Sequence, residues 1–222
     1  MMSWLPENIS ADGVHLDFLF YAIYYITGII FILVAGCMIA FLILYRQKPG
    51  VRATYTHGHS TLEIVWTVTP TIILVIILFL SHASWAKMKL NPPKNPDVRL
   101  EVIAKQFNWI VAYPGPDGKF GTKDDVKLDN QVNIPINKTV YISLTGEDVI
   151  HSFFIPHARV KQDVVPGRQM AVWFKPIKTG KFEIPCAELC GTGHSGMKGE
   201  LIVHSAASYQ AFLKKLYAKK SS

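Results

Sequence analysis

A cluster of residues that can bind soft metal ions lies between Cys186 and Met197. The segment reads Cys-Ala-Glu-Leu-Cys-Gly-Thr-Gly-His-Ser-Gly-Met and contains two of the three cysteines of the chain. Thiolate, thioether and imidazole groups together favour copper, whereas carboxylate and carbonyl oxygens favour magnesium or calcium. The glycines in the segment allow tight backbone turns, so that these side chains can converge on one point. The segment therefore predicts a copper site with Cys186, Cys190, His194 and Met197 among its ligands.

One more nitrogen ligand is expected outside this segment, and His151 is the best candidate. It follows an apolar pair and lies just before two phenylalanines, where a solvent-exposed histidine would be out of place. A mononuclear blue-copper site contains a single cysteine, whereas this segment contains two. Two bridging thiolates would hold a pair of copper ions, with His151 and either Met197 or His194 completing each ion. Because such a pair shares one charge and changes its geometry little on reduction, it suits electron transfer better than substrate chemistry.

Two other interpretations of Cys186 and Cys190 are open. They could form a structural disulfide, as is common outside the cytoplasm, but the two histidines and the methionine would then have no role. A thioredoxin-like copper-delivery protein also uses a Cys-x-x-x-Cys motif with a distant histidine, but the nearby His194 and the surrounding strand patterns argue against it. The third cysteine, Cys37, lies within an apolar stretch and is expected only to pack against lipid or a neighbouring helix.

Two long apolar stretches predict membrane-spanning helices. No Asp, Glu, Lys or Arg occurs between residues 18 and 45 or between residues 64 and 86. Each stretch exceeds the roughly 20 residues that a helix needs to cross about 30 Å of hydrocarbon. The loop between them carries Arg46, Lys48 and Arg52 without an acid, so the positive-inside rule places the loop in the cytoplasm and both termini outside.

The rest of the chain predicts one external β domain. A proline-rich connector at residues 91–96 precedes about 125 residues, which is one domain's worth of chain. Alternating or β-branched segments recur at residues 98–104, 126–134, 139–144, 169–175, 181–185 and 200–204. This spacing is typical of an antiparallel sandwich or Greek-key barrel. Residues 206–219 predict a helix with Tyr209, Phe212, Leu213 and Leu216 on one face.

The predicted fold is therefore a two-helix transmembrane hairpin followed by an all-β domain. Half of the residues are hydrophobic and 18% are charged, which excludes a disordered chain. The predicted boundaries are an external segment at 1–17, helices at 18–45 and 62–86 with a cytoplasmic loop at 46–61, a linker at 87–97, the β domain at 98–205 and a C-terminal helix and tail at 206–222.

Four motifs along the chain carry a resemblance to one family. Residues 186–197 match every position of the pattern Cys-x-Glu-x-Cys-x-x-x-His-x-x-Met. The other three motifs are Glu63-Ile64-Val65-Trp66-Thr67 followed by Pro70, Asp148-Val149-Ile150-His151-Ser152, and Lys161-Gln162-Asp163-Val164-Val165-Pro166-Gly167-Arg168. Together they make the chain resemble subunit II of haem-copper cytochrome c oxidase, whose dinuclear copper site is called CuA. The resemblance covers about residues 15–217.

The resemblance implies a fold and a set of site residues. The β domain would be a cupredoxin-like Greek-key barrel. The implied ligands of the dinuclear copper are the bridging thiolates of Cys186 and Cys190, the imidazoles of His151 and His194, the thioether of Met197 and the backbone carbonyl of Glu188. The side chain of Glu188 would also bind a magnesium ion shared with subunit I. Glu63 would lie at the inner mouth of a proton path into subunit I, although from position alone it could be an interfacial anchor.

The aromatic run at which electrons would enter departs from the family's usual pattern, Gln-Trp-Tyr-Trp-x-Tyr. This chain has Gln106-Phe107-Asn108-Trp109-Ile110-Val111 instead. Phe107 takes the place of the usual tryptophan, and Trp109 still aligns with an aromatic residue. Both are therefore expected to serve electron transfer, and the competing interpretation of Trp109 is a core aromatic on a strand.

The charge of the predicted β domain bears on its electron donor. Residues 87–222 contain 20 Lys and Arg against 12 Asp and Glu, whereas the family commonly presents acids to a basic cytochrome c. Asp117, Asp124, Asp125 and Asp129 are close in sequence and would form a local docking edge. The alternative is an acidic or tethered cytochrome donor. The loop at residues 114–125 departs from the mitochondrial form, which favours a bacterial inner membrane.

The expected function is that of the subunit that takes electrons from cytochrome c and passes them to haem in subunit I, where oxygen is reduced to water and protons are pumped. Subunits I and III and membrane lipid are the other expected partners, nucleic acid is not, and the chain alone should catalyse nothing. The alternatives are the CuA subunit of a nitric oxide reductase and a membrane-anchored copper-delivery protein. A quinol oxidase subunit is excluded, because it would lack these copper ligands.

Overall fold

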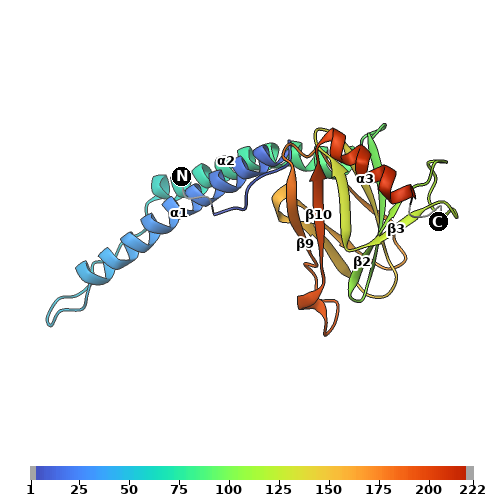
Figure 1. The fold of residues 1–222 in the computed structure, drawn as a ribbon. Helices are drawn as coiled ribbons and strands as arrows, with labels where there is room; N and C mark the ends of the chain where they lie inside the picture. The colour runs from blue at the N-terminus through green and yellow to red at the C-terminus, as the bar shows by residue number, and fades with distance from the viewer. Residues whose placement is uncertain (1–3, 219–222) are drawn as a thin grey trace. The chain divides into compact units, whose positions relative to one another are not determined.

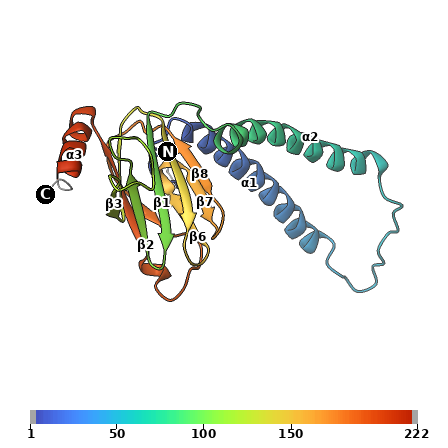
Figure 2. The same ribbon diagram turned by 90° about the vertical axis from the view of Figure 1, so that its right-hand side faces the viewer.

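The computed structural model describes residues 4–218, which form two compact units. One unit contains residues 15–85, and the other contains residues 4–14 together with residues 86–218. The ribbon views show that long helices make up the first unit, whereas the second is a β domain with a helix near the end of the chain (Figures 1 and 2).

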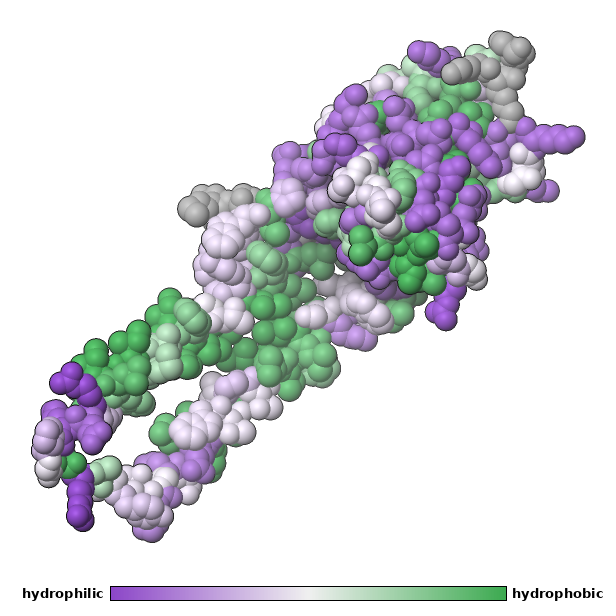
Figure 3. Space-filling view, turned by 90° about the horizontal axis from the view of Figure 1, so that it is seen from below, coloured by the Kyte–Doolittle hydropathy of each residue, from purple (hydrophilic) through white to green (hydrophobic). Residues whose placement is uncertain are grey.

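The first unit consists of two long apolar helices. α1 runs over Gly13–Leu44 and α2 over Ser60–Trp85. At about 1.5 Å per residue, each exceeds the roughly 30 Å of a bilayer's hydrocarbon core. The most apolar window of each helix contains no buried residue, and hydrophobic residues cover much of both helices (Figure 3). Helices that are apolar on every side and unburied are typical of membrane spans. α1 begins before the predicted start at residue 18, because the polar residues His15 and Asp17 are also helical.

The second unit contains three β-sheets among the described residues. The five-stranded sheet has the order β3-β2-β1-β5-β8, formed by β1 (Val98–Lys105), β2 (Asn108–Tyr113), β3 (Val126–Asp129), β5 (Val140–Gly146) and β8 (Met170–Phe174). The three-stranded sheet has the order β4-β10-β9, formed by β4 (Gln131–Pro135), β9 (Gly180–Pro185) and β10 (Lys198–His204). A third sheet pairs β6 (His151–Ile155) with β7 (Val160–Val164).

Side chains that alternate along these strands form the hydrophobic core. Val102 and Val111 from the five-stranded sheet and Leu201 and Ile134 from the three-stranded sheet are fully buried in one cluster. Each buried aliphatic side chain of this size contributes about 1.5–3 kcal/mol through its removal from water. The core therefore holds the sheets together and fixes the loops that leave their ends.

The predicted antiparallel Greek-key barrel is corrected in two respects, although the fold is cupredoxin-like. β1 pairs in parallel with β5, placing Val98 opposite Val140, and β10 pairs in parallel with β4. The chain crosses to the other sheet through β4 between β1 and β5, so it re-enters the first sheet in the same direction as β1. The described strands remain in separate sheets and do not close into a barrel.

Several strand boundaries also differ from the predicted ones. The single strand predicted at residues 126–134 is divided at Asn130, whose φ of 57° lies in the left-handed region, so that β3 and β4 enter different sheets. β2, β6 and β7 were not predicted as strands. Consecutive side chains of β2 and nearly all of those of β6 are buried, which removes the alternation that marks a strand in sequence.

The N-terminal segment is an integral part of the β domain. Ile9 is fully buried, its backbone N–H donates to the carbonyl of His157 at 2.9 Å, and its carbonyl accepts from the N–H of Ile177 at 2.8 Å. Asp12 forms an ion pair with Lys87 at 2.5 Å. The predicted external segment at residues 1–17 therefore contains an extra edge of the folded domain, so the full chain is the appropriate form for experiments.

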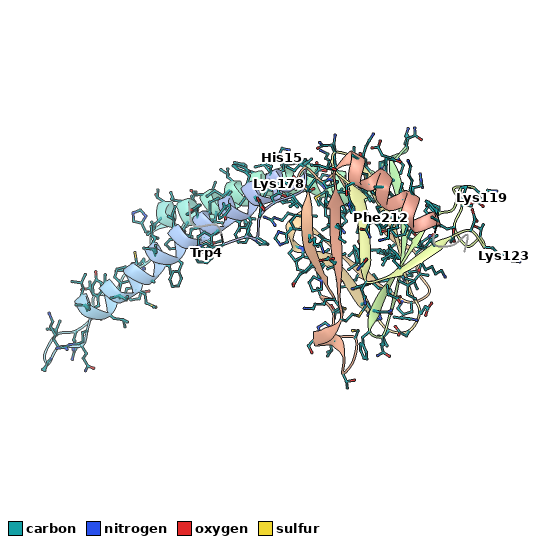
Figure 4. All side chains as sticks on the ribbon, viewed as in Figure 1. Trp4, His15, Lys119, Lys123, Lys178 and Phe212 are labelled. Carbon is teal, nitrogen blue, oxygen red and sulfur yellow. The ribbon has the colours of Figure 1, made fainter. Side chains whose placement is uncertain are left out.

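The C-terminal helix packs on the β domain. α3 runs over Ala206–Ala218, and its Leu216 is buried while Phe212 and Leu213 are partly buried against the core (Figure 4). The hydroxyl of Tyr217 donates to the carbonyl of Pro114 at 2.6 Å. This agrees with the apolar face predicted for residues 206–219, of which residue 219 lies outside the described residues.

Candidate metal centre

Three connections at one end of the β domain surround the predicted metal ligands. They are the β1–β2 turn (residues 106–107), the histidine turn (residues 147–150) that precedes His151, and the ligand loop (residues 186–197) between β9 and β10. β1 and β5 run in parallel and end side by side, with Ala104 opposite Gly146, so the first two connections meet. An isolated bridge between Phe153 and Cys186 joins the ligand loop to β6.

Strand pairing brings the two ends of the ligand loop together. Pro185 of β9 lies opposite Lys198 of β10, and the backbone N–H of Cys186 donates to the carbonyl of Met197 at 3.0 Å. The N–H of Ala187 donates to the carbonyl of Ser152 at 3.0 Å, which fixes the same end of the loop beside His151. The tight pattern of ligands in sequence is thus converted into a closed cluster by the β9–β10 hairpin.

The predicted ligand atoms converge around the two cysteines. The sulfur atoms of Cys186 and Cys190 are 3.8 Å apart. The Nδ1 atom of His151 is 3.9 Å from the Cys186 sulfur, and the carbonyl oxygen of Glu188 is 3.3 Å from the same sulfur. The other sulfur, that of Cys190, lies 3.6 Å from Nδ1 of His194 and 3.7 Å from the Met197 sulfur.

These separations suit ligands that share a metal ion. Two donors bound to one ion at about 2.0–2.3 Å with tetrahedral angles lie roughly 3.3–3.8 Å apart. The observed spacings fall at or close to that range, and the ligand atoms of His151, Cys186 and Cys190 all lie within 4.8 Å of one another. All three residues are buried, as is Met197. The donor set therefore fits soft metal ions held in a protected site.

Both cysteines of the cluster are free thiols, so the alternative of a structural disulfide between them does not apply here. Burial raises the pKa of the Cys190 thiol to about 11, and its hydrogen bond with Cys186 acts in the same direction. The thiolate form that binds a metal is therefore disfavoured at neutral pH unless a cation compensates its charge. Cys190 is thus a buried thiol and lacks the lowered pKa that marks a reactive, solvent-exposed cysteine.

Asp148, to which the sequence assigned no role, contacts the predicted ligand His151. Its Oδ1 atom lies 2.8 Å from Nε2 of His151, which leaves Nδ1 of the imidazole directed at Cys186. Partial burial alone would raise the pKa of Asp148, but hydrogen bonds from His151 and from the N–H groups of Gln106 and Val149 outweigh it and hold the pKa below its ordinary value. A carboxylate behind a histidine ligand orients the ring and increases its basicity. Its signal in the sequence was its position three residues before His151.

Phe107 covers the ligand loop. Its side chain is 37% exposed, and its ring packs against the glycines of the loop. A Cβ atom at Gly193 would lie 2.5 Å from the Phe107 ring, and one at Gly191 would lie 3.1 Å from it. Two glycines are therefore needed for the ring to approach this closely. Phe107 is the exposed aromatic residue beside the cluster, in the position predicted for electron transfer.

Trp109 lies in the core beneath the cluster. Its side chain is fully buried, and its ring contacts His151 and Phe153 edge-on at centroid distances of 6.0 and 5.3 Å. Its backbone N–H donates to Oδ1 of Asn130 at 2.8 Å. The structure thus shows Trp109 as a core aromatic, and its contact with a ligand histidine is compatible with the predicted electron-transfer role.

The two glutamates predicted to have roles lie in different units. The carbonyl of Glu188 faces Cys186, while its side chain is exposed. Glu63 lies in the first turn of α2, in the helical unit. The N–H of Leu62 donates to Nδ1 of His59 at 3.2 Å, so the helix that carries Glu63 has a side-chain cap.

The predicted acidic docking edge is not formed as one patch, which corrects that expectation. Asp129 lies at the end of β3 beside Asn108, with 3.2 Å between their side chains. Asp117, Asp124 and Asp125 lie in the connection at the opposite end of β2 and β3, one strand length of roughly 17 Å away. Asp117 and Asp125 accept hydrogen bonds from backbone N–H groups of their own loop, whose tip carries Lys119 and Lys123 (Figure 4). The exposed acids beside the cluster are instead Glu147, Asp148 and Glu188.

Comparisons with known proteins agree with this fold. The family model described as "Cytochrome C oxidase subunit II, periplasmic domain" matches residues 102–205, and that described as "Cytochrome C oxidase subunit II, transmembrane domain" matches residues 2–83. The range matched by the periplasmic-domain model contains the whole ligand cluster, and the range matched by the transmembrane-domain model contains Glu63. They also establish the chain as a membrane-anchored protein.

Individual relatives cover most of the chain. It is 30% identical to the alternative cytochrome c oxidase subunit 2 of Bradyrhizobium diazoefficiens, over 95% of this chain and 82% of the relative. It is 32% identical to cytochrome c oxidase subunit 2 of Cereibacter sphaeroides, over 86% of this chain and 75% of the relative. The crystal structure of the periplasmic domain of subunit II of cytochrome oxidase of Bradyrhizobium japonicum superposes with a TM-score of 0.50 at 31% identity, covering 56% of this chain and 96% of that one. The chain therefore belongs to the cytochrome c oxidase subunit II family.

Proposed function

We propose that the cluster around Cys186 and Cys190 holds a dinuclear copper centre of the CuA type. One observation carries the proposal: each sulfur has its own imidazole and its own weak donor. His151 and the Glu188 carbonyl lie beside Cys186, whereas His194 and Met197 lie beside Cys190. A mononuclear site would leave half of these donors unused. Copper is also the metal that the family binds.

On this basis the chain is the subunit at which electrons enter a terminal respiratory oxidase. A bound copper pair supplies one-electron transfer from cytochrome c towards haem in subunit I, where oxygen is reduced to water and protons are translocated. The residues of this chain exclude water, because His151 is fully buried and Cys190 and Met197 are 3% and 1% exposed. They also hold the donors in fixed positions, since β9, β10 and β6 all belong to the core of the domain.

We further propose that Glu188 has two functions. Its carbonyl faces the Cys186 sulfur, while its carboxylate points out of the cluster and is free to bind a magnesium ion at the interface with subunit I. Metal analysis of the assembled oxidase, with and without the substitution Glu188→Gln, would test this assignment.

The proposed membrane placement follows from the charge of the loop between the helices. Arg46, Lys48 and Arg52 lie in this connection, which supports a cytoplasmic loop, with the metal domain and both termini on the periplasmic side of a bacterial inner membrane. The exposed apolar faces of α1 and α2 are available to lipid and to subunits I and III. Protease accessibility of the metal domain in sealed membrane vesicles measures this orientation.

Glu63 is proposed to lie at the mouth of a proton path on the cytoplasmic side. It is exposed in the first turn of α2, and a Cβ atom at Gly58 would lie 3.1 Å from its carboxylate, so the backbone approaches the carboxylate closely. Glu63→Gln in the assembled oxidase should lower proton-coupled turnover by at least about tenfold, because an amide cannot take up a proton. Glu63→Asp should retain most of it, and the copper content should be unchanged in both. Normal turnover of Glu63→Gln would leave Glu63 as an interfacial anchor.

Phe107 is proposed as the residue over which electrons enter. It is the exposed aromatic side chain that packs on the ligand loop beside Cys190. Phe107→Ala should slow reduction of the copper centre by cytochrome c roughly tenfold, the effect of losing an aromatic contact at an interface. Stopped-flow reduction of the full oxidase measures it, and Phe120→Ala, in the loop at the other end of the domain, is the control. An unchanged rate would show that electrons enter elsewhere.

The central test is metal stoichiometry in the full-length chain. The chain, purified in detergent micelles and loaded with copper, should contain two coppers, and its electron paramagnetic resonance spectrum should show hyperfine lines from one electron shared equally by two nuclei. One copper with an ordinary localised spectrum, surrendered to a modest chelator, would contradict the proposal and favour a copper-delivery protein. Reduction of nitric oxide instead of oxygen by the assembled enzyme would favour the CuA subunit of a nitric oxide reductase.

A further inference from the structure

The ligand cluster depends on two separate parts of the chain that must be held together. His151 follows the histidine turn, whereas the remaining ligands lie in the ligand loop. At the Cys186 end these parts are joined directly, by the hydrogen bond from Ala187 to the Ser152 carbonyl and by the bridge between Phe153 and Cys186. The Cys190 end lies farther along the loop, beyond this pairing.

Gln106, in the β1–β2 turn, supplies a connection at the Cys190 end. Its side-chain Nε2 donates to the carbonyl of Cys190 at 2.6 Å. Its backbone N–H donates to Oδ2 of Asp148 in the histidine turn at 2.7 Å. One residue therefore hydrogen-bonds to both ligand-bearing parts of the chain.

The ligand loop is shaped to admit this side chain. Gly191 follows Cys190 directly and has a φ of 133°, which L side chains rarely adopt. A Cβ atom there would lie 2.7 Å from Nε2 of Gln106, so any other residue would push the amide away from the Cys190 carbonyl. The glycine thus serves the contact with Gln106 as well as the turn of the loop.

Asp148 extends the connection to His151. Its Oδ2 accepts the hydrogen bond from Gln106, while its Oδ1 lies 2.8 Å from Nε2 of His151. The resulting chain of contacts runs from His151 through Asp148 and Gln106 to Cys190, around the outside of the cluster. A shift of the Cys190 backbone would change three distances at once, because its sulfur is the neighbour of the Cys186, His194 and Met197 donors.

We propose that Gln106 is a positioning residue that fixes Cys190 relative to His151 and so keeps the two halves of the metal centre equivalent. The proposal rests on the dinuclear copper function proposed above. Gln106 contacts the backbone of one ligand and the carboxylate behind another, so it acts through them and binds no metal itself. Substitutions behind the ligands of a metal site typically change metal affinity or activity by about 10–100-fold.

The test compares Gln106→Ala and Gln106→Glu in the copper-loaded, full-length chain in detergent micelles. Gln106→Glu keeps the shape of the side chain but replaces the N–H donor by an oxygen that repels the Cys190 carbonyl, so its effect should equal or exceed that of Gln106→Ala. The rate of copper transfer from the ascorbate-reduced centre to the Cu(I) chelator bathocuproine disulfonate should rise roughly tenfold in both variants. In the oxidised, mixed-valence form, the hyperfine lines should show unequal sharing of the electron between the two nuclei.

Gln210 provides a matched control, since it lies exposed on α3 in the same domain. Gln210→Ala and Gln210→Glu make the same chemical changes and should leave both measurements as in the unsubstituted chain. Thermal unfolding of the apoprotein shows that each variant is folded. If Gln106→Ala unfolds, Gln106→Glu alone carries the comparison.

Two results would overturn the inference while leaving the dinuclear centre intact. The first is a release rate within about twofold of the Gln210 variants together with unchanged hyperfine lines. The second is faster copper release with unchanged hyperfine lines. In that case the substitution would have changed how well the ligand loop is shielded from the chelator, and not the position of Cys190. An unsubstituted chain that binds fewer than two coppers would contradict the proposed function and this inference together.

Discussion

Cys190→Ser should remove the dinuclear copper centre and lower cytochrome c oxidation by the assembled oxidase by at least about 100-fold. The Cys190 sulfur has three neighbouring donors, at 3.8 Å from the Cys186 sulfur, 3.6 Å from the His194 nitrogen and 3.7 Å from the Met197 sulfur. A serine hydroxyl is a hard, weakly acidic donor and does not replace a bridging thiolate for copper. Copper analysis and electron paramagnetic resonance of the purified chain should show at most one copper without the shared-electron spectrum.

Cys37→Ser is the matched control for this experiment. Cys37 is an exposed residue of α1 in the helical unit, so the same chemical change is made outside the metal domain. Copper content and turnover should remain unchanged. Because a buried hydroxyl without a partner costs about 1–3 kcal/mol, melting of the apoprotein must be recorded for Cys190→Ser as well. Two coppers per chain in folded Cys190→Ser would contradict the bridging role of this thiolate.

Trp109→Ala should lower the free energy of unfolding of the β domain by about 3–5 kcal/mol. Trp109 is fully buried and supports both His151 and Phe153 through ring contacts. Such a loss is a large part of the 5–15 kcal/mol that typically stabilises a domain. Denaturant unfolding of the full chain, followed through the near-ultraviolet signal of the metal domain, measures the change.

Trp109→Phe separates the structural role of Trp109 from an electronic one. The indole Nε1–H is buried and has no hydrogen-bond partner among the described residues, so its removal relieves an unsatisfied donor. The expected loss of stability is therefore only about 1–2 kcal/mol, and copper should still bind. If the indole carries electrons, cytochrome c should reduce the copper centre of this folded variant more slowly than that of the unsubstituted chain. A normal reduction rate would leave Trp109 as a core residue alone.

The residues of the metal site could be predicted from the sequence because most of them lie in one short segment. The soft ligands within residues 186–197 are so close in sequence that they lie near one another once the glycines allow the backbone to turn. The role of His151 could be predicted because a polar residue in an apolar run is unusual. The two membrane helices were predicted for a similar reason, since the absence of charge over their length is a local property.

The residues around the ligands could not be predicted in this way, because they are joined by contacts between distant parts of the chain. Gln106 and Asp148 are 42 residues apart in sequence and meet because β1 and β5 end side by side in a parallel pair. Gln106 also contacts Cys190, which is 84 residues away in the loop between two strands of the other sheet. The pairing of β1 with β5 depends on the crossing of β4 into the other sheet, which begins at the left-handed residue Asn130. Hydrophobic periodicity records which residues are buried, but it does not record the partner of each strand.

The acidic residues also show the difference between what the sequence predicts and what strand pairing decides. Asp117, Asp124, Asp125 and Asp129 are neighbours in the sequence, yet an antiparallel pair of strands places Asp129 next to Asn108 and the other three at the opposite end of the two strands. The sequence by itself determined the kinds of ligand, the membrane helices and the presence of a β domain, because these follow from composition and local spacing. Only the tertiary structure decided which side chains support the ligands and which charges surround them, because those contacts arise from strand pairing between segments far apart in the chain.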